Sequence, residues 1–265
     1  MRILHIAQGE SDWFQEHLGR ATASNAAAIL DFTKTGAEGS KRRLYRLTKV
    51  AETLSMIGGA PNYVSAPMLA GTAAEPLART AYELEEKVMV EQVGFIVGDD
   101  ERTGWSPDGL VGDVGAIEIK GPKTTTHLAT LDSGLIPEDN LPQLWFDFMV
   151  SENLEWIDFI SRDGGMCEDK HVIAEAKASG ADLRILPLRY AQFTIRLWRK
   201  DCLAQIAKMR IETDRFLADV DATVKRINEK APALAQEETP HPDAAINAAL
   251  AQDFAEDIAW AQQNL

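Results

Sequence analysis

The chain has 265 residues, of which 45% are apolar and 26% are charged, so it can bury a core of the size found in one large domain with an extension. No run reaches the roughly 18 apolar residues of a membrane helix, and acids replace the apolar stretch of a signal peptide at the start, so we exclude a membrane protein and expect a cytoplasmic one. Cys167 and Cys202 are far apart in the sequence, which argues against zinc fingers and iron–sulfur clusters.

The formal net charge of −14 is unfavourable for binding a polyanion, because affinity for phosphates comes largely from Lys and Arg. The charge is unevenly distributed, however. Residues 233–265 contain six acids and no Lys or Arg, so the tail contributes much of the negative charge. A basic cluster in the body fits equally a solvated helix face and a phosphate-contacting patch; it consists of Lys41, Arg42, Arg43, Arg46 and Lys49.

The first half of the chain has three helical patterns. Small hydroxyl residues before an apolar run predict a helix beginning near Ser24. Between Lys41 and Ile57 apolar residues recur at steps of three and four, which predicts an amphipathic helix that ends at Gly58-Gly59. A third pattern covers residues 73–87, and its Pro76 requires the helix to begin close by, because proline is tolerated in the first turn.

The second half begins with β-branched residues and glycines over 88–119, which predict a β-meander. The elements expected after it are a helix over 143–151, strands near 154–160 and 183–188, and a long helix over about 190–228. Strands that alternate with helices around one sheet predict an α/β or α+β fold of undetermined strand order. We expect one domain over residues 1–232 and an acidic extension over 233–265, with a loop and then a short helix after Pro232.

The strongest chemical signal is Trp105-Ser-Pro-Asp108-Gly, followed by Glu118-Ile119-Lys120. Alternate side chains of a strand face the same way, so Glu118 and Lys120 project from one face, and a hairpin can place Asp108 beside them. Two carboxylates and the Ile119 carbonyl make an oxygen-rich site for a hard cation such as Mg²⁺. A lysine there can stabilise an attacking hydroxide and the charge that grows on a phosphate. The pattern favours phosphodiester hydrolysis, and an ordinary polar hairpin is the alternative.

These residues match the PD-(D/E)xK nuclease motif, and further segments resemble the lambda-type phage exonuclease family, also called YqaJ-like viral recombinases. The resemblance spans roughly residues 8–160 and comprises Gln8-Gly9 with Trp13, Leu18-Gly19, Thr22-Ala-Ser24, Gly71-Thr-Ala-Ala-Glu75-Pro-Leu-Ala-Arg79, Tyr82-Glu83, Ser106-Pro-Asp108-Gly-Leu, Glu118-Ile-Lys120-Gly-Pro122 and Gln143. It implies a restriction-endonuclease-like core in which helices flank a central mixed β-sheet.

The resemblance also implies roles for the catalytic residues. Asp108, Glu118 and the Ile119 carbonyl would bind the metal, and Lys120 would position the nucleophile. Glu75 would be a further active-site acid that holds a second ion or its water. A surface pair between Glu75 and Arg79 on one helix explains the same two residues without a catalytic role.

For the DNA, the resemblance implies that Ser24 binds the 5′-phosphate, although a helix-capping serine explains the same residue. His17 stands where the family's best-known member has an arginine, and histidine is a weaker and pH-dependent partner of phosphate. Arg20 is the candidate replacement. Gln143 and Lys123 are further candidate DNA contacts, with ordinary solvated side chains as the alternative.

The activity implied is metal-dependent digestion of linear double-stranded DNA in the 5′ to 3′ direction, which releases mononucleotides and leaves a 3′ single-stranded overhang for recombination. The cofactor implied is Mg²⁺, or Mn²⁺ in its place, with two ions per site, and the partners are DNA ends and a single-strand annealing protein. A homotrimeric ring is also implied. An endonuclease with the same motif and an inactive DNA-end-binding scaffold remain as alternatives. The acidic tail is expected to pack on a neighbouring subunit or bind a partner.

Overall fold

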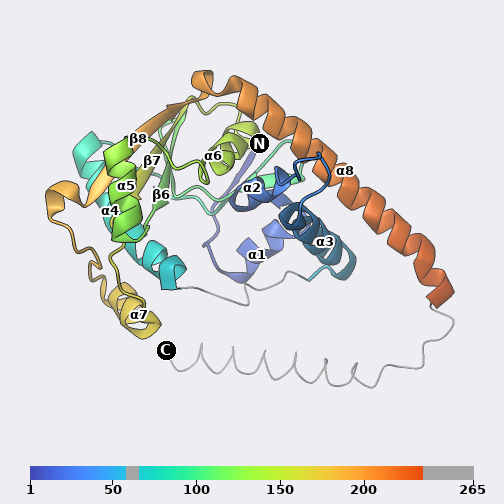
Figure 1. Ribbon diagram of the computed structural model, residues 1–265, viewed down its shortest axis with the longest axis horizontal. Coiled ribbons are helices and arrows are strands. Elements are labelled where there is room, and N and C mark those ends of the chain that lie inside the picture. Colours follow the sequence, from blue (N-terminus) through green and yellow to red (C-terminus); the bar gives the residue numbers. More distant parts are fainter. Residues whose placement is uncertain (58–65, 235–265) are drawn as a thin grey trace. The chain divides into compact units, whose positions relative to one another are not determined.

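A computed structural model describes residues 1–57 and 66–234. The chain divides into two compact units, Met1–Asp221 and Ala222–Leu265, and the architecture below is that of the first unit (Figure 1). The predicted stop at Gly58-Gly59, and the acidic extension from residue 235 onward, lie outside the described residues. No helix in the described ranges is both long enough and apolar enough to cross a membrane.

The elements follow one another as β1 (Arg2–Leu4), α1 (Ser11–His17), β2 (Ala21–Thr22), the 3₁₀ turn η1 (Ala23–Asn25), α2 (Ala26–Ile29), α3 (Ser40–Ser55), α4 (Ala66–Glu86), β3 (Phe95–Val97), β4 (Thr103–Trp105), β5 (Gly109–Val111), β6 (Gly115–Lys120), α5 (Thr124–Ser133), α6 (Leu141–Val150), β7 (Trp156–Arg162), α7 (Lys170–Ser179), the 3₁₀ turn η2 (Leu188–Tyr190), β8 (Gln192–Trp198), the 3₁₀ turn η3 (Arg199–Asp201) and α8 (Leu203–Leu234). The predicted mixed α/β class with flanking helices is confirmed.

The described strands form two four-stranded sheets where we expected one. The first has the order β1-β3-β4-β2, and the second has the order β5-β6-β7-β8. In the second sheet β6 and β7 are parallel, and the two outer pairs are antiparallel. Residues 88–119 therefore do not form one meander, because the chain leaves the first sheet after β4 and enters the second at β5. Asp108 lies at this crossing.

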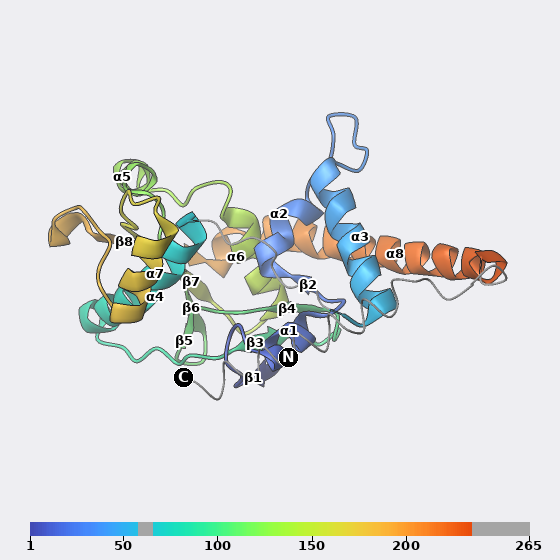
Figure 2. The ribbon, with the colours of Figure 1, turned by 90° about the horizontal axis from the view of Figure 1, so that it is seen from below.

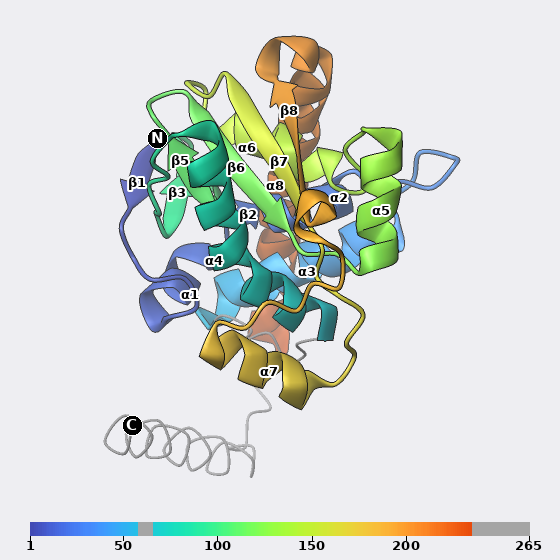
Figure 3. The ribbon, with the colours of Figure 1, turned by 90° about the vertical axis from the view of Figure 1, so that its left-hand side faces the viewer.

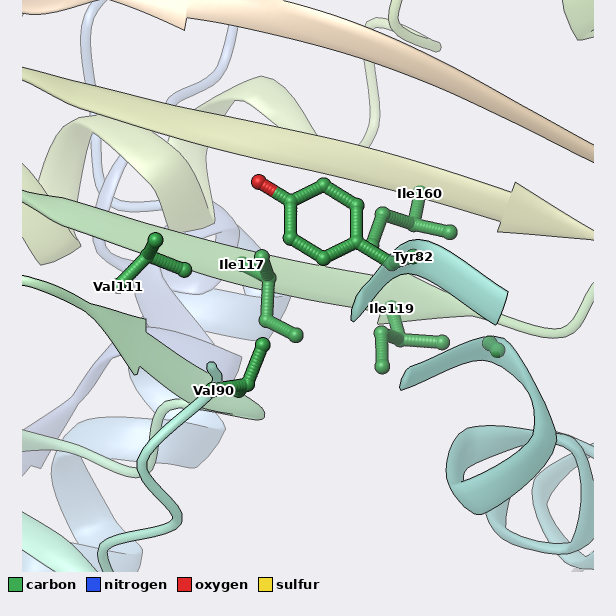
Figure 4. Close-up of a cluster of buried hydrophobic side chains, with 7 residues drawn as sticks. Tyr82, Val90, Val111, Ile117, Ile119 and Ile160 are labelled. Carbon is green, nitrogen blue, oxygen red and sulfur yellow. The ribbon is translucent and has the colours of Figure 1, made fainter. Parts of the chain in front are cut away.

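Helix α4 covers one face of the second sheet (Figure 3). Its Tyr82 packs among buried aliphatic residues of β5, β6 and β7, including Ile117, Ile119 and Ile160 (Figure 4). Because side chains alternate along a strand, Glu118 of β6 points to the opposite face. There it contacts α6, so the acidic residue and the apolar core occupy different sides of one strand.

Helix α3 confirms the pattern predicted between residues 41 and 57, and it packs on the part of α8 that belongs to the first unit (Figure 2). The rings of Tyr45 and Phe216 stack with their centroids 5.0 Å apart. The basic cluster does not form one surface, because Arg42 and Lys49 are buried whereas Lys41 and Arg43 are exposed.

Two predicted helix starts in the first half of the chain were wrong. The helix expected from Ser24 is the turn η1 followed by the short α2, since Ser24 lies within the turn. Helix α4 begins at Ala66, so Pro76 lies inside the helix rather than in its first turn. A proline there removes one backbone hydrogen bond, and burial of Ala78 and Tyr82 helps to hold the helix together.

The region after residue 165 differs most from the prediction. The expected strand over 183–188 is absent, and the expected helix from 190 begins as β8, which pairs with β7 along its whole length. Phe193, Ile195 and Leu197 alternate with more polar residues, a two-residue period that indicates a strand. Helix α7 was missed, although Asp169 caps its start and Gly180 ends it in a left-handed conformation.

Candidate active site

The segment that carries Asp108 is held by the N-terminal part of the chain. Gln8 donates its amide to the Pro107 carbonyl at 3.2 Å, and the Trp13 indole donates to Ser106 Oγ at 2.9 Å. Arg79 of α4 donates to the Asp108 carbonyl at 3.1 Å. Residues that are distant in sequence therefore fix the crossing between the two sheets, and with it the position of the Asp108 carboxylate.

Asp108 lies against the end of β6. Its Oδ2 accepts the backbone N–H of Ile119 at 2.6 Å. The N–H and C=O of one strand residue point to the same side of the strand, so the Ile119 carbonyl also points toward Asp108. The side chain of Ile119 is buried in the core beneath α4, which leaves its backbone as the group available to a ligand.

Glu118, Lys120 and Gln143 form a closed hydrogen-bonded triangle. The Lys120 ammonium is 2.5 Å from Glu118 Oε1 and donates to Gln143 Oε1 at 3.1 Å. The Gln143 amide in turn donates to Glu118 Oε1 at 2.6 Å. An amide that accepts from the lysine and donates to the glutamate fixes both side chains, so Gln143 belongs to the site through direct contact.

Asp147 is a neighbour of the site that the sequence analysis missed. It follows Gln143 by one turn of α6, a spacing that places both residues on one helix face. It is fully buried, and neither of its carboxylate oxygens has a hydrogen-bond partner among the described residues. Burial, and then the charge of Glu118, raise the pKa of Asp147 well above its ordinary value.

The pKa of Asp108 is likewise raised, first by burial and then by the nearby charges of Glu118 and Glu75. Burial by itself lowers the pKa of Lys120, but attraction to Glu118 and the other acids outweighs it, and the pKa is raised. Lys120 therefore stays cationic among carboxyl groups that repel one another. We refer to Asp108, Glu118, Lys120, Gln143 and Asp147 as the acidic edge.

Glu75 approaches the acidic edge from α4. Burial raises its pKa, Arg79 lowers it, and Glu118 raises it again, so Glu75 is within electrostatic reach of the acidic edge and of its expected partner Arg79. Two glycines allow the helix to come this near, because a Cβ on Gly121 would lie 2.9 Å from Gly71 Cα. Glu75 and Lys120 line a cavity of about 550 Å³ between α4 and the start of α5.

The donor set fits a hard divalent cation. Glu118 Oε2 is buried and accepts no hydrogen bond from the described residues, and the Asp108 carboxylate and Ile119 carbonyl supply further oxygens nearby. Within residues 1–57 and 66–234, no three acidic, His or Cys side chains already surround one point. Lys120 contacts Glu118 Oε1, and the Ile119 N–H donates to Asp108 Oδ2.

A second cavity, of about 360 Å³, is lined in part by Gln143. Ser24 and His17 both line it, together with Thr22, Asn25 and Ser106. The structure thus brings Ser24 and His17 together in one cavity that Gln143 also lines. Trp13 also lines this cavity rather than filling the core.

Two candidate DNA contacts lie apart from these cavities. The Arg20 guanidinium donates to the carbonyls of Glu16 and Glu101 and forms ion pairs with both side chains. Lys123 precedes α5 and pairs with Glu168 on the surface. Neither residue lines the cavities described above.

The chain is similar to one known protein family and to solved nuclease structures. The model for the YqaJ-like viral recombinase domain matches residues 12–153. No curated protein sequence matches the chain. An alkaline exonuclease from Laribacter hongkongensis, solved also in complex with dAMP, is 31% identical, with a TM-score of 0.68, and the match covers 85% of this chain and 100% of that one.

A phage-related exonuclease from Haemophilus somnus 129PT is 11% identical with a TM-score of 0.56, and the match covers 78% of this chain and 96% of that one. This second likeness shows the fold alone. Together with the Laribacter structures it confirms the predicted fold class, in which helices flank mixed sheets as in nucleases of the PD-(D/E)xK type.

Proposed function

Because the chain belongs to the YqaJ-like viral recombinase family, we propose that it is a phage-type exonuclease that requires a divalent metal and digests linear double-stranded DNA from its 5′ ends to mononucleotides. The names of the similar structures support the exonuclease class. The observation that carries the proposal is the acidic edge, where Asp108, Glu118 and Lys120 meet beside a cavity.

Asp108, Glu118 and the Ile119 carbonyl would hold one Mg²⁺ or Mn²⁺ ion, and Glu75 would hold a second ion or its water. Such an ion supplies an activated water and neutralises charge on the phosphate. Glu118 would offer its Oε2, which has no partner among the described residues, so Lys120 could keep its pairing with Oε1. Because three carboxyl groups at this point repel one another, the bound cation would also relieve an unfavourable interaction.

Lys120 would then stabilise the attacking water and the negative charge that develops on the phosphate. Gln143 helps to keep the ammonium oriented, because its Oε1 accepts a hydrogen bond from Lys120. The side chain of Lys120 is 34% exposed and lines the larger cavity, so a phosphate that enters the cavity can reach it.

We further propose the remaining family properties for this chain, namely a homotrimeric ring around DNA, a 3′ overhang as product and a single-strand annealing protein as partner. Residues 233–265 are proposed to act as an extension that packs on a neighbouring subunit or binds a partner. An enclosed duplex cannot diffuse away between cuts, so a ring needs only modest electrostatic affinity. This property suits a chain with a net charge of −14.

The test is to incubate the protein with linear duplex DNA labelled at the 5′ or the 3′ end, with Mg²⁺ or with EDTA, beside closed circular DNA. Lys120→Ala is compared with Lys208→Ala, which removes an exposed lysine of α8. We expect mononucleotides from the 5′ end of linear DNA, only with metal and not with Lys120→Ala. Cleavage of circles would favour the endonuclease alternative, and binding without degradation would favour the scaffold.

A further inference from the structure

The smaller cavity contains a cation that the family resemblance did not point to. Lys49 of α3 lines it and is 4% exposed. Burial of an ammonium is unfavourable and lowers the pKa of Lys49, whereas its bond to Glu52 acts in the opposite direction. Glu52 lines the same cavity and pairs with Lys49, so Lys49 brings a paired positive charge to this cavity.

Lys49 is held in place yet retains a free donor. Its Nζ donates to Glu52 Oε2 at 2.7 Å and to the His17 carbonyl at 3.4 Å. An ammonium has three N–H groups, so one is left besides these two hydrogen bonds, and the centroid of the Tyr45 ring lies 5.4 Å from Nζ. Glu52 Oε2 also accepts the Gly19 N–H at 3.0 Å, so the carboxylate that balances Lys49 is itself anchored by the backbone.

The other cavity walls carry neutral donors. Asn25 donates to the hydroxyls of Thr22 and Ser24, each at 3.3 Å, which gathers three small polar side chains on one wall. Ser106 Oγ accepts the Trp13 indole N–H, so its own hydroxyl hydrogen is left to donate. Hydroxyl donors around one ammonium make a site suited to a phosphate oxygen.

The two basic residues that the resemblance offered for the 5′-phosphate, His17 and Arg20, are unsuited to the same task. The Nδ1 atom of His17 is 2.6 Å from the Trp13 carbonyl, which can only accept, so Nδ1 carries the proton and Nε2 of the neutral ring is an acceptor. Burial lowers the pKa of His17, which favours that neutral ring. Arg20 is committed to Glu16 and Glu101.

The chemistry of the proposed reaction identifies the phosphate. Hydrolysis that releases 5′-mononucleotides leaves a new 5′-phosphate on the shortened strand, so each cycle after the first presents the same terminal group. A cavity of about 360 Å³ is near the lower end of the range for small-molecule sites, so it suits one terminal group rather than a stretch of duplex. Gln143 borders this cavity and bonds to Glu118, which links it to the cleavage site.

We propose that Lys49 supplies the cation that binds the terminal 5′-phosphate of the DNA, in the cavity lined by Thr22, Ser24 and Ser106, in place of His17 or Arg20. The proposal rests on the function proposed above and identifies how that site selects an end. Glu52 keeps Lys49 charged and oriented while no phosphate is bound.

The test measures selectivity for the end, because a purely structural role of Lys49 would slow the reaction of every substrate alike. Duplexes with 2-aminopurine as the 5′-terminal nucleotide are prepared with a 5′-phosphate or a 5′-hydroxyl, and release of this first nucleotide is followed in a single turnover. Only the first cut distinguishes the two substrates. We expect the wild-type protein to prefer the phosphate by about ten- to a hundred-fold, the range for hydrogen bonds to charged groups.

In Lys49→Gln the preference should fall to within about three-fold of unity, and Lys49→Arg should restore part of it. Because Lys49→Gln leaves Glu52 without its cation, Lys49→Gln with Glu52→Gln provides a variant with a neutral pair, and thermal unfolding checks that each variant folds. Lys208→Gln removes the same charge from an exposed site on α8 and should keep the wild-type ratio.

A wild-type ratio in the folded Lys49 variants, or loss of the preference in Arg20→Gln, would overturn the proposal. Binding of the two duplexes is also measured in EDTA by fluorescence anisotropy, where no cleavage occurs. If the wild-type protein fails to cleave but binds the phosphorylated end more tightly through Lys49, the proposed activity fails and this inference stands. If the protein binds the 5′-phosphate and 5′-hydroxyl duplexes equally tightly, this inference fails, whether or not the protein cleaves DNA.

Discussion

Asp147 and Asp163 are both almost completely buried, yet their surroundings differ in every other respect. Asp163 accepts hydrogen bonds from the Thr124 hydroxyl at 2.5 Å and from the backbone N–H groups of Gly165, Ile185 and Leu186 at 3.0, 2.9 and 2.8 Å. Asp147 accepts none from the described residues. Burial by itself raises the pKa of Asp163, but these bonds outweigh it and lower the pKa, whereas the pKa of Asp147 is raised.

The difference separates a carboxylate that stabilises the fold from one that costs stability. Asp163 joins the loop after β7 to α5 and to residues 185–186, so its charge is matched by donors. Asp147 shares its surroundings with Glu118, whose Oε2 also lacks a partner among the described atoms. Unmatched carboxylates of this kind are expected where a cation must bind, because the protein gives up stability there for function.

The largest effect should come from Asp163→Ala, which leaves four donors without their acceptor. At about 1 kcal/mol or more for each buried unpaired group, the free energy of unfolding should fall by about 4 kcal/mol. Urea unfolding measures the loss, and Asp132→Ala, at an exposed position of α5, should change it by less than about 0.5 kcal/mol. Equal losses in the two variants would contradict a structural role for Asp163.

Lys120→Ala should act mainly on the reaction rate. Loss of the cation that stabilises negative charge on the phosphate should lower kcat by about 10²- to 10³-fold, as for other preorganised donors. Nucleotide release from linear duplex measures the rate, and circular dichroism checks the fold. A Lys120→Ala protein that retains kcat would show that the acidic edge is not the site of cleavage.

Asp147→Asn should stabilise the protein, in contrast to the change at Asp163. Removal of a buried carboxyl beside Glu118 should raise the free energy of unfolding at pH 8, because burial and the charge of Glu118 raise its pKa in the folded state. A carboxyl whose pKa is raised by folding destabilises the protein increasingly as pH rises above its unfolded pKa of about 3.9. The gain should therefore be smaller at pH 5, and a loss of stability at both pH values would contradict this account.

The smallest expected effect is the loss, at acid pH, of the stability that Asp163 contributes. Its folded pKa is lowered, so the stability it contributes is complete above the unfolded pKa of about 3.9 and is lost as pH falls below that value. The difference in unfolding free energy between the wild-type protein and Asp163→Asn should thus shrink below about pH 4. Urea titrations at pH 3 and pH 6 measure it, and a constant difference would rule out this linkage.

The sequence predicted the acidic edge best where its residues are close along the chain. Glu118 and Lys120 alternate on one strand, and a short hairpin brings Asp108 to them, so local geometry sufficed. Gln143 required the family resemblance, because nothing local indicates which strand α6 packs on. Asp147 was open to prediction from its spacing to Gln143, but its importance depends on the absence of partners, which only the structure reveals.

Other features depend on contacts between distant segments. Asp163 obtains its donors from segments on both sides of it, and Lys49 lies among residues of α1, β2 and η1, so composition alone left the basic cluster unresolved. In β8 the two-residue period was present but was attributed to a helix. The signals at the ends of α7, Asp169 and Gly180, were local and were overlooked.

The most direct test of the acidic edge is calorimetric titration of Mn²⁺ into the wild-type protein, Glu118→Gln and the exposed control Asp132→Asn. We predict saturable binding by the wild-type and control proteins, a rise in their Tm with metal because only the folded state binds it, and loss of both effects in Glu118→Gln. Undiminished metal binding by a folded Glu118→Gln would contradict the account.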